Sequence, residues 1–364
     1  MSGSVRVQGV TLALGAFRLR EIDLAVSSGE ILVIIGANGS GKSVTLETIA
    51  GFHRPDSGRI LIGGRDVTEL PPERRNVGFV VQDFGLFPHL SVAQNVAIAR
   101  RGSRITTARN TAPPPLGDDA ALLRYFGAEH LAAQKPASLS PGEKQRVALA
   151  RALAGAPDLF LFDEPFSALD AETRDRLREE LKSFLRALDI PAIFVSHDRT
   201  DAQALADKIA VLGDGAVMQS GSAEDVWRRP ASATVARFIG VENVLAARAI
   251  KCSGDDTWVE IGEQRLTATA AAPPVQARRA VSVSIRADDV VIGPPDGFGA
   301  SGSNRLAGRV ISSRNDGALV TLAIDCGFPL KAYVLAREAR SMSLGHGSAV
   351  AVAIAPEAIH VMPD

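Results

Sequence analysis

The segment from Gly36 to Ser43 combines residue types that bind phosphate groups in proteins. It reads Gly36-Ala37-Asn38-Gly39-Ser40-Gly41-Lys42-Ser43 and fits the pattern G-x-x-x-x-G-K-[ST] at every position. The glycines allow backbone N–H groups to converge on phosphate oxygens, and the start of the following helix adds a positive dipole. We expect Lys42 to reach the β- and γ-phosphates of a nucleotide, and Ser43 to place its hydroxyl on Mg²⁺. A plain glycine turn is the alternative, which the complete motif disfavours.

Two adjacent carboxylates, Asp163 and Glu164, follow the apolar run from Leu159 to Phe162. The run predicts a buried strand, and parallel sheets bind ligands at the carboxyl ends of their strands. We therefore expect Asp163 to contact Mg²⁺ and Glu164 to accept a proton from an attacking water. The alternative is a pair of exposed turn carboxylates.

A second potential anion site begins at Ser140. The segment reads Leu139-Ser140-Pro141-Gly142-Glu143-Lys144-Gln145-Arg146. Ser140 is a favourable N-cap, Pro141 suits the first turn of a helix, and Glu143 completes a capping box. One nucleotide has no obvious use for two phosphate sites in one chain, whereas two chains arranged head to tail would use both. An ordinary helix N-cap is the alternative interpretation.

These motifs need a scaffold, and residues 1–235 have the pattern of an α/β domain. Apolar runs at 30–35, 159–162 and 192–195 predict buried parallel strands. Apolar residues at helical spacing between the last two runs predict an amphipathic helix. Strand, helix and strand in this order indicate a parallel sheet.

Residues 241–364 differ, because alternation replaces helical spacing. Segments 281–286 and 350–355 alternate with period two, which predicts strands. Residues 243–250 and 304–311 agree at five of eight positions, and each precedes one of these strands. The repeat predicts two β-barrel-like halves of about 60 residues each. Chance similarity between valine-rich strands is the alternative.

Composition restricts the class of protein. The length of 364 residues favours two domains, and a net charge of −1 gives no global field that attracts nucleic acid. Cys252 and Cys326, the two cysteines, do not form a metal-binding pattern or a disulfide framework. The first eight residues lack the pattern of a signal peptide, and no run of 18 uncharged apolar residues occurs. We therefore expect a cytosolic protein that reaches a membrane only through a partner.

Taken in order, the motifs of residues 1 to about 235 resemble those of ABC transporter ATP-binding subunits. The segment at Ser140 is similar to the signature motif, Gln82 to the Q-loop glutamine, residues 167–170 to the D-loop, and His197 to the switch histidine. The resemblance implies a P-loop ATPase with a helical subdomain, followed by an all-β, OB-like domain with the internal repeat. It implies ATP and Mg²⁺ as cofactors. The implied catalytic residues are Glu164, His197 and Gln82; the metal contacts are Ser43, Gln82 and Asp163; the nucleotide contacts are Gly36, Asn38, Gly39, Ser40, Gly41, Lys42, Ser43, Ser140, Gly142 and Asp170.

The chain departs from the family's pattern at three places. Pro141 replaces a glycine and removes one N–H donor, although Gly142 still allows close approach of the backbone. Glu143 replaces a glutamine. The aromatic residue that the family often stacks on adenine corresponds to Leu14, or to Phe17 if the loop is shifted.

The resemblance also implies partners and a location. The expected partners are a second copy of the chain, integral membrane permease subunits and, indirectly, an external substrate-binding protein, with no nucleic acid. The expected location is peripheral, at the cytoplasmic face of the inner membrane. A soluble ABC ATPase without a transport role is the alternative class, and a storage or sensing protein is a third.

Within the importers, residues 75–83, 284–290 and 301–310 are similar to those of molybdate or tungstate importer ATPases that carry an oxyanion-binding β domain. A tetrahedral oxyanion favours hydroxyls and cations at close range, which Ser301, Ser303, Arg305 and Lys331 would supply. A Gly/Ser loop without a ligand is the alternative at this segment. Sulfate, ferric ion and polyamine importers remain alternatives for the substrate.

Overall fold

The computed structural model describes residues 4–102, 118–167, 169–253, 256–269, 279–295 and 304–363. The chain divides into two compact units, Met1–Ala223 and Glu224–Asp364, and each is treated by itself below. In the described part of the chain, none of the helices has the length and apolar character needed to cross a membrane. The domain limits predicted from the sequence, 1–235 and 241–364, stay a prediction.

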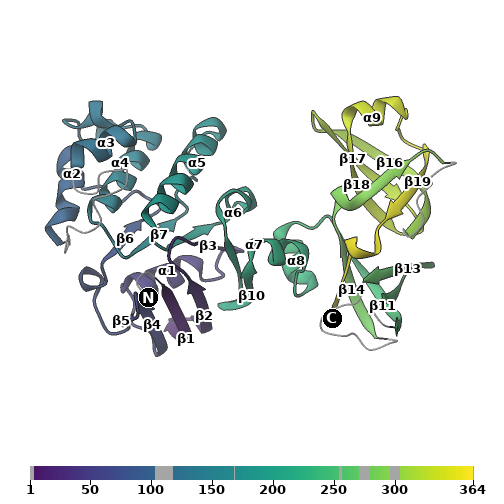
Figure 1. The fold of residues 1–364 in the computed structure, drawn as a ribbon, viewed down its shortest axis with the longest axis horizontal. Helices are drawn as coiled ribbons and strands as arrows, with labels where there is room; N and C mark the ends of the chain where they lie inside the picture. Colours follow the sequence, from purple (N-terminus) through teal and green to yellow (C-terminus); the bar gives the residue numbers. More distant parts are fainter. Residues whose placement is uncertain are drawn as a thin grey trace. The chain divides into compact units, whose positions relative to one another are not determined.

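A six-stranded sheet forms the centre of the first unit (Figure 1). Its order is β10-β9-β3-β8-β7-β6, and all neighbours except β10 and β9 pair in parallel. The strands are β3 (Ile31–Gly36), β6 (Val77–Val80), β7 (Leu159–Asp163), β8 (Ala192–Ser196), β9 (Lys208–Gly213) and β10 (Ala216–Ser222). Every residue of β3, β7 and β8 is buried, as expected for parallel strands covered on both faces. The predicted α/β fold is confirmed.

The carboxyl ends of β3, β7 and β8 lie at one edge of this sheet. Ile35 lies opposite Ser196, and Asp163 lies opposite Val195. The loops that follow the three strands therefore begin side by side, where a single ligand can contact all of them.

The predicted amphipathic helix is α5 (Ala171–Leu188). Asp170 caps its first turn by accepting a hydrogen bond of 3.0 Å from the N–H of Thr173. The helix buries an apolar stripe at helical spacing, made of Leu177, Leu181, Phe184 and Leu185. This stripe fixes which face of α5 meets the sheet.

Two further layers complete the first unit. An antiparallel sheet of order β2-β1-β4-β5 shares an apolar core with the first helix and with the central sheet. Three helices, α2, α3 and α4, pack together as a helical part (Figure 1). The elements are β1 (Val5–Leu14), β2 (Phe17–Val26), α1 (Lys42–Ala50), β4 (Ser57–Ile62), β5 (Arg65–Asp66), η1 (Pro72–Arg74), α2 (Val92–Ile98), η2 (Ala99–Gly102), α3 (Asp119–Tyr125), η4 (Glu129–Leu131), η5 (Pro136–Ser138), α4 (Pro141–Ala154) and α6 (Arg199–Leu205).

The second unit contains two five-stranded antiparallel sheets around one apolar core. The elements are α7 (Ala223–Arg228), which crosses the division between the units, α8 (Ala233–Ile239), β11 (Asn243–Ser253), β12 (Asp256–Ile261), β13 (Gln264–Thr269), β14 (Ala280–Ile285), η6 (Ala287–Asp289), β15 (Val290–Gly293), β16 (Asn304–Asn315), β17 (Leu319–Asp325), β18 (Pro329–Leu335), α9 (Ala336–Ser341), β19 (Ala349–Ile354), η7 (Pro356–Ala358) and β20 (Ile359–Pro363). The predicted all-β, OB-like fold is confirmed.

The predicted internal repeat is confirmed by the strand orders. One sheet runs β13-β12-β11-β14-β20, and the other runs β18-β17-β16-β19-β15. The two orders correspond strand for strand, with the last strand of each sheet taken from the other repeat. The halves are therefore not independent barrels, because β20 pairs with β14 and β15 pairs with β19.

The first asparagine of each repeat joins the two sheets. The amide of Asn243 accepts a hydrogen bond from the N–H of Lys331 (2.6 Å) and donates to its C=O (3.0 Å). In the same way, Asn304 accepts from the N–H of Thr267 (2.6 Å) and donates to its C=O (2.8 Å). Lys331 and Thr267 belong to β18 and β13, which are edge strands. Each side-chain amide thus replaces the peptide group of a missing neighbour strand.

Candidate nucleotide-binding and hydrolysis site

The loop between β3 and α1 has the geometry of a phosphate cradle. Gly41 adopts a left-handed conformation with φ of 101°, and a Cβ there would lie 2.6 Å from the ring of Phe17. At Gly36, a Cβ would lie 2.5 Å from the carbonyl oxygen of Leu212. Both positions therefore require glycine, because a side chain would displace backbone or core atoms. Phe17, one of the two candidates for adenine stacking, packs against this loop.

Polar groups inside the loop fit a bound phosphate. The hydroxyl of Ser40 is buried and lacks a hydrogen-bond partner. Lys42 is 6% exposed, and its Nζ donates to the carbonyl oxygens of Gly36 (2.8 Å) and Ala37 (3.1 Å). Burial lowers the pKa of Lys42, while the charges of Glu164 and Asp163 oppose that change. A bound anion would accept a hydrogen bond from the Ser40 hydroxyl and would neutralise the buried charge of Lys42.

Ser43 and Asp163 lie together at the base of the loop. The hydroxyl of Ser43 donates to Oδ1 of Asp163 at 3.2 Å. Burial raises the pKa of Asp163, and the hydrogen bond from Ser43 acts in the opposite direction. The described residues contain no cluster of three His, Cys, Asp or Glu side chains that would bind a metal alone. The hydroxyl and the carboxylate fit Mg²⁺, which binds through one or two protein oxygens together with nucleotide phosphates.

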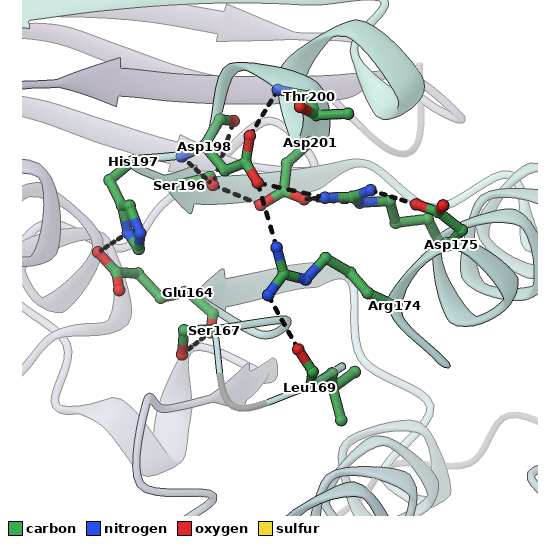
Figure 2. Close-up of polar contacts among 11 residues, drawn as sticks. Glu164, Ser167, Leu169, Arg174, Asp175, Ser196, His197, Asp198, Thr200 and Asp201 are labelled. Carbon is green, nitrogen blue, oxygen red and sulfur yellow. Dashed lines mark hydrogen bonds and ion pairs between the residues drawn. The ribbon is translucent and has the colours of Figure 1, made fainter. Parts of the chain in front are cut away.

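Glu164 and His197 face each other across the ends of β7 and β8 (Figure 2). Nδ1 of His197 lies 3.0 Å from Oε1 of Glu164, and the His197 side chain is 55% exposed. Glu164 has a φ of 49°, and its N–H donates to the carbonyl oxygen of Val195 at 3.0 Å. Non-glycine residues rarely adopt this conformation, so the surrounding contacts hold the backbone in place. The carboxylate is thereby directed toward the histidine.

Ser140 begins α4 with the predicted capping box. Oε2 of Glu143 accepts hydrogen bonds from the N–H of Ser140 (2.7 Å) and from its hydroxyl (2.8 Å). Both hydrogen bonds lower the pKa of Glu143, and the bond from the backbone N–H has the larger effect. The Glu143 carboxylate therefore accepts hydrogen bonds from the Ser140 N–H and hydroxyl, the groups that we expected to bind phosphate.

The other predicted residues of the ATP site lie as follows. Gln82 is exposed and follows β6, the neighbour of β7, so it starts from the same sheet edge as Asp163. Asn38 is exposed in the phosphate loop, Gly142 lies in the first turn of α4, and Leu14 ends β1. In the segment 167–170, Ala168 lies outside the described residues.

The predicted oxyanion residues are only partly described. Ser301 and Ser303 lie outside the described residues, as does Gly302 between them, whereas residues 304–310 are described. Arg305 belongs to β16 and Lys331 to β18, with β17 between these strands. Both side chains are exposed.

A group of charged residues behind His197 was not predicted from the sequence. Arg174 and Arg178 of α5 contact Asp198 and Asp201, which lie just after His197 (Figure 2). One signal was available: Arg178 falls on the apolar stripe of α5, next to Leu177 and Leu181, where a charged residue is unusual.

Comparisons with known proteins agree with this geometry. A family model described as ABC transporter matches residues 19–167. The molybdate/tungstate import ATP-binding protein WtpC of Pyrococcus horikoshii is 36% identical over 99% of this chain and 100% of its own length. The Fe(3+) ions import ATP-binding protein FbpC of Brucella abortus is 38% identical over 83% of each chain. Among solved structures, a dimeric ATP-binding cassette bound to ADP and Pi is 31% identical over 60% of this chain and 98% of that chain, with a TM-score of 0.51.

Proposed function

Because this chain belongs to the ABC transporter ATP-binding proteins, and is an ATPase of the importer type, we propose that it energises the uptake of molybdate or tungstate. The choice of substrate is supported by the similarity to a molybdate/tungstate import protein along nearly the whole of both chains. The similarity to a ferric-ion import protein spans a smaller share of each chain. Ferric ion is therefore the second candidate, and transport assays distinguish the two.

The proposed hydrolysis uses side chains at the edge of the central sheet. Lys42 exchanges its carbonyl partners for phosphate oxygens, and the loop residues Gly36, Asn38, Gly39, Ser40, Gly41 and Ser43 contact the phosphates through N–H or hydroxyl groups. Ser43, Asp163 and Gln82 would hold Mg²⁺, which would supply positive charge against the phosphates. Glu164 accepts the proton of the attacking water, and His197 orients its carboxylate.

The proposed active form contains two copies of the chain. Ser140, Gly142 and Asp170 of one copy contact the nucleotide held by Lys42 of the other. The dimeric cassette bound to ADP and Pi, which this chain resembles, supports that arrangement. It also gives a use to the helix end at Ser140, whose N–H and hydroxyl bind Glu143 of the same helix.

Mixing two inactive variants tests the two-chain site. Lys42→Ala removes the phosphate contact, and Ser140→Arg blocks the helix end, so each variant alone should not hydrolyse ATP. A mixed dimer would contain one intact composite site, and activity should rise to a maximum at equal amounts of the two chains. Activity that equals the sum of the separate variants at every ratio would contradict a shared site.

The proposed partners are integral membrane permease subunits, with an external substrate-binding protein acting through them. The chain would then lie at the cytoplasmic face of the inner membrane as a peripheral subunit. A soluble ATPase without a transport role would hydrolyse ATP at the same rate with or without membrane subunits. Stimulation of hydrolysis by the reconstituted permease therefore separates the two classes.

We propose that the second unit senses the transported oxyanion through Ser301, Ser303, Arg305 and Lys331. A bound anion would favour an open pair of ATPase units and slow uptake as the product accumulates. A tenfold suppression requires a preference for the open state of about 1.4 kcal/mol, which a few charge-assisted hydrogen bonds supply.

A titration of the reconstituted transporter tests both the substrate and the sensor. ATP hydrolysis is measured against molybdate, tungstate and sulfate on the cytosolic side. Inhibition by molybdate or tungstate should disappear on truncation near residue 240 and weaken in Lys331→Ala. If hydrolysis does not respond to any of the three anions, the second unit is structural.

A further inference from the structure

Two arginines of α5, Arg174 and Arg178, contact acidic residues that follow His197 in the chain. Arg178 is 4% exposed, and its Nε donates to Oδ1 of Asp201 at 2.6 Å. Asp201 is itself 5% exposed. Breaking a buried ion pair is costly, and an apolar residue at this position would pack against the stripe of α5 without any desolvation. The pair therefore requires an explanation beyond the stability of the helix.

Arg178 contacts the two turns that carry the catalytic side chains. Its guanidinium lies 5.8 Å from the ring centroid of Phe166, which follows Glu164 by two residues and is 1% exposed. The same guanidinium lies 3.5 Å from Oδ2 of Asp198, the residue after His197. One buried side chain thus contacts both sides of the Glu164–His197 pair.

The residues on either side of His197 are fixed by hydrogen bonds. The N–H of Asp198 donates to the hydroxyl of Ser196 at 3.0 Å, and that hydroxyl donates to Oδ2 of Asp201. Oδ1 of Asp198 accepts from the N–H of Thr200 at 2.8 Å. The His197 ring is largely exposed, so its position follows from this backbone and from its contact with Glu164.

Asp198 is held as a carboxylate in this position. Burial alone would raise its pKa, but the hydrogen bonds from Thr200 and the charges of Arg178 and Arg174 lower it below the usual value. The carboxylate is therefore available as an acceptor for both arginines at neutral pH.

Arg174 links this group to the segment 167–170. Figure 2 shows its side chain between Leu169 and Asp198. Nη2 donates to the carbonyl oxygen of Leu169 at 2.9 Å, and Nη1 lies 3.3 Å from Oδ2 of Asp198. A guanidinium is planar and rigid, so a shift of Leu169 must move Asp198 or break one of these contacts.

We propose that Arg174 and Arg178 are positioning residues that couple the segment 167–170 to the placement of His197 against Glu164. This inference rests on the proposed roles of Glu164 and His197. The segment 167–170 leads to Asp170, which we assign to the nucleotide of the second copy. Arg174 then makes the geometry of one hydrolysis site depend on the contact between the two copies, and Arg178 keeps the two turns aligned with each other.

Variants of the full-length chain test the coupling. Arg174→Met removes both contacts and keeps the length of the side chain, while Arg174→Lys keeps the charge but not the planar fork. Asp198→Asn keeps the cap of α6 and removes the charge. Arg186→Met is the matched control, because Arg186 is also on α5 and pairs with Asp207 at 3.2 Å outside this group.

The expected result is a loss in kcat with little change in the KM for ATP. Misplacing a catalytic group by about 1 Å lowers the rate by up to about 100-fold, so we expect kcat to fall about 10- to 100-fold in Arg174→Met. Arg174→Lys should not restore it, and Arg186→Met should keep the original kcat. Equal losses in Arg174→Met and Arg186→Met would overturn the proposal, as would full rescue by lysine.

A double-mutant cycle with His197→Ala separates positioning from a general structural effect. If Arg174 acts through His197, adding Arg174→Met to His197→Ala should not lower kcat further. If the fold-losses in kcat of the two single variants multiply in the double variant, Arg174 does not act through His197 and the proposal is wrong. If His197→Ala alone retains full activity, the assigned role of His197 fails instead, which is a distinct outcome.

Discussion

Replacing Asn243 by alanine should destabilise the second unit more than any change at an exposed strand position. Asn243 is 3% exposed, and its amide makes three hydrogen bonds, two with Lys331 and one with the carbonyl oxygen of Ile285. Each bond contributes about 1 kcal/mol, and a buried N–H left without a partner costs about 1–3 kcal/mol. We therefore expect a loss of about 2–4 kcal/mol in the free energy of unfolding. Asn304 is only half-buried, so water replaces part of its contacts and the loss should be smaller.

Tryptophan fluorescence measures this unit within the intact chain. The chain has two tryptophans, Trp227 and Trp258, and both belong to the second unit. Urea titrations monitored by their emission give the free energy of unfolding by linear extrapolation. Ser313→Ala, at an exposed position of β16, is the control.

The aspartate variant makes the test sharper. Asn243→Asp keeps the acceptor for the N–H of Lys331 but places a carboxylate against two carbonyl oxygens. We expect Asn243→Asp to be at least as destabilising as Asn243→Ala, because a buried charge then lacks donors. A loss below about 0.5 kcal/mol in Asn243→Ala, the range of ordinary surface changes, would refute this account of how the sheets are joined.

Three further predictions concern single side chains. Glu164→Gln should lower the rate of ATP hydrolysis by about 10²- to 10⁴-fold while ATP binding is retained, and wild-type turnover would exclude Glu164 as the base. Glu143→Gln should lower the KM for ATP about two- to fivefold, because a neutral amide competes less with phosphate for the donors of Ser140; an unchanged or higher KM would contradict this. Burial lowers the pKa of His360, with a smaller opposing effect from its 3.0 Å contact with the carbonyl oxygen of Pro230. Protonation therefore favours the unfolded state, so the second unit should lose stability as pH falls below about 6.5 and His360→Gln should remove that pH dependence, measured by urea titration at each pH.

The sequence predicted the features that depend on neighbouring residues. The phosphate loop, the carboxylates after β7 and the capping box at Ser140 each lie within one short segment, and local geometry determines their form. The repeat was also visible, because similar strands share alternating patterns.

Features that depend on the choice of a distant partner were not predictable in this way. Alternation in β14 predicts a strand but does not specify that β20 is its neighbour. Arg174 and Asp198 have ordinary residue types for exposed positions, and only the packing of α5 against α6 makes them partners. Pairings of this kind are determined by tertiary packing, and a short stretch of sequence does not specify them.

The exchange of strands between the repeats also determines the order in which the chain can fold during synthesis. In the first sheet of the second unit, β14 pairs with β11 but lacks its second neighbour until residues 359–363 have left the ribosome, whereas the pairings of the first unit involve residues up to 222. A nascent chain, or one shortened before residue 359, would expose the unpaired edge of β14, whose side chains are largely buried in the finished protein. Exposed, apolar strand edges promote aggregation. Loss of a few residues at β20 is therefore expected to reduce the yield of folded protein far more than the five residues of that strand suggest.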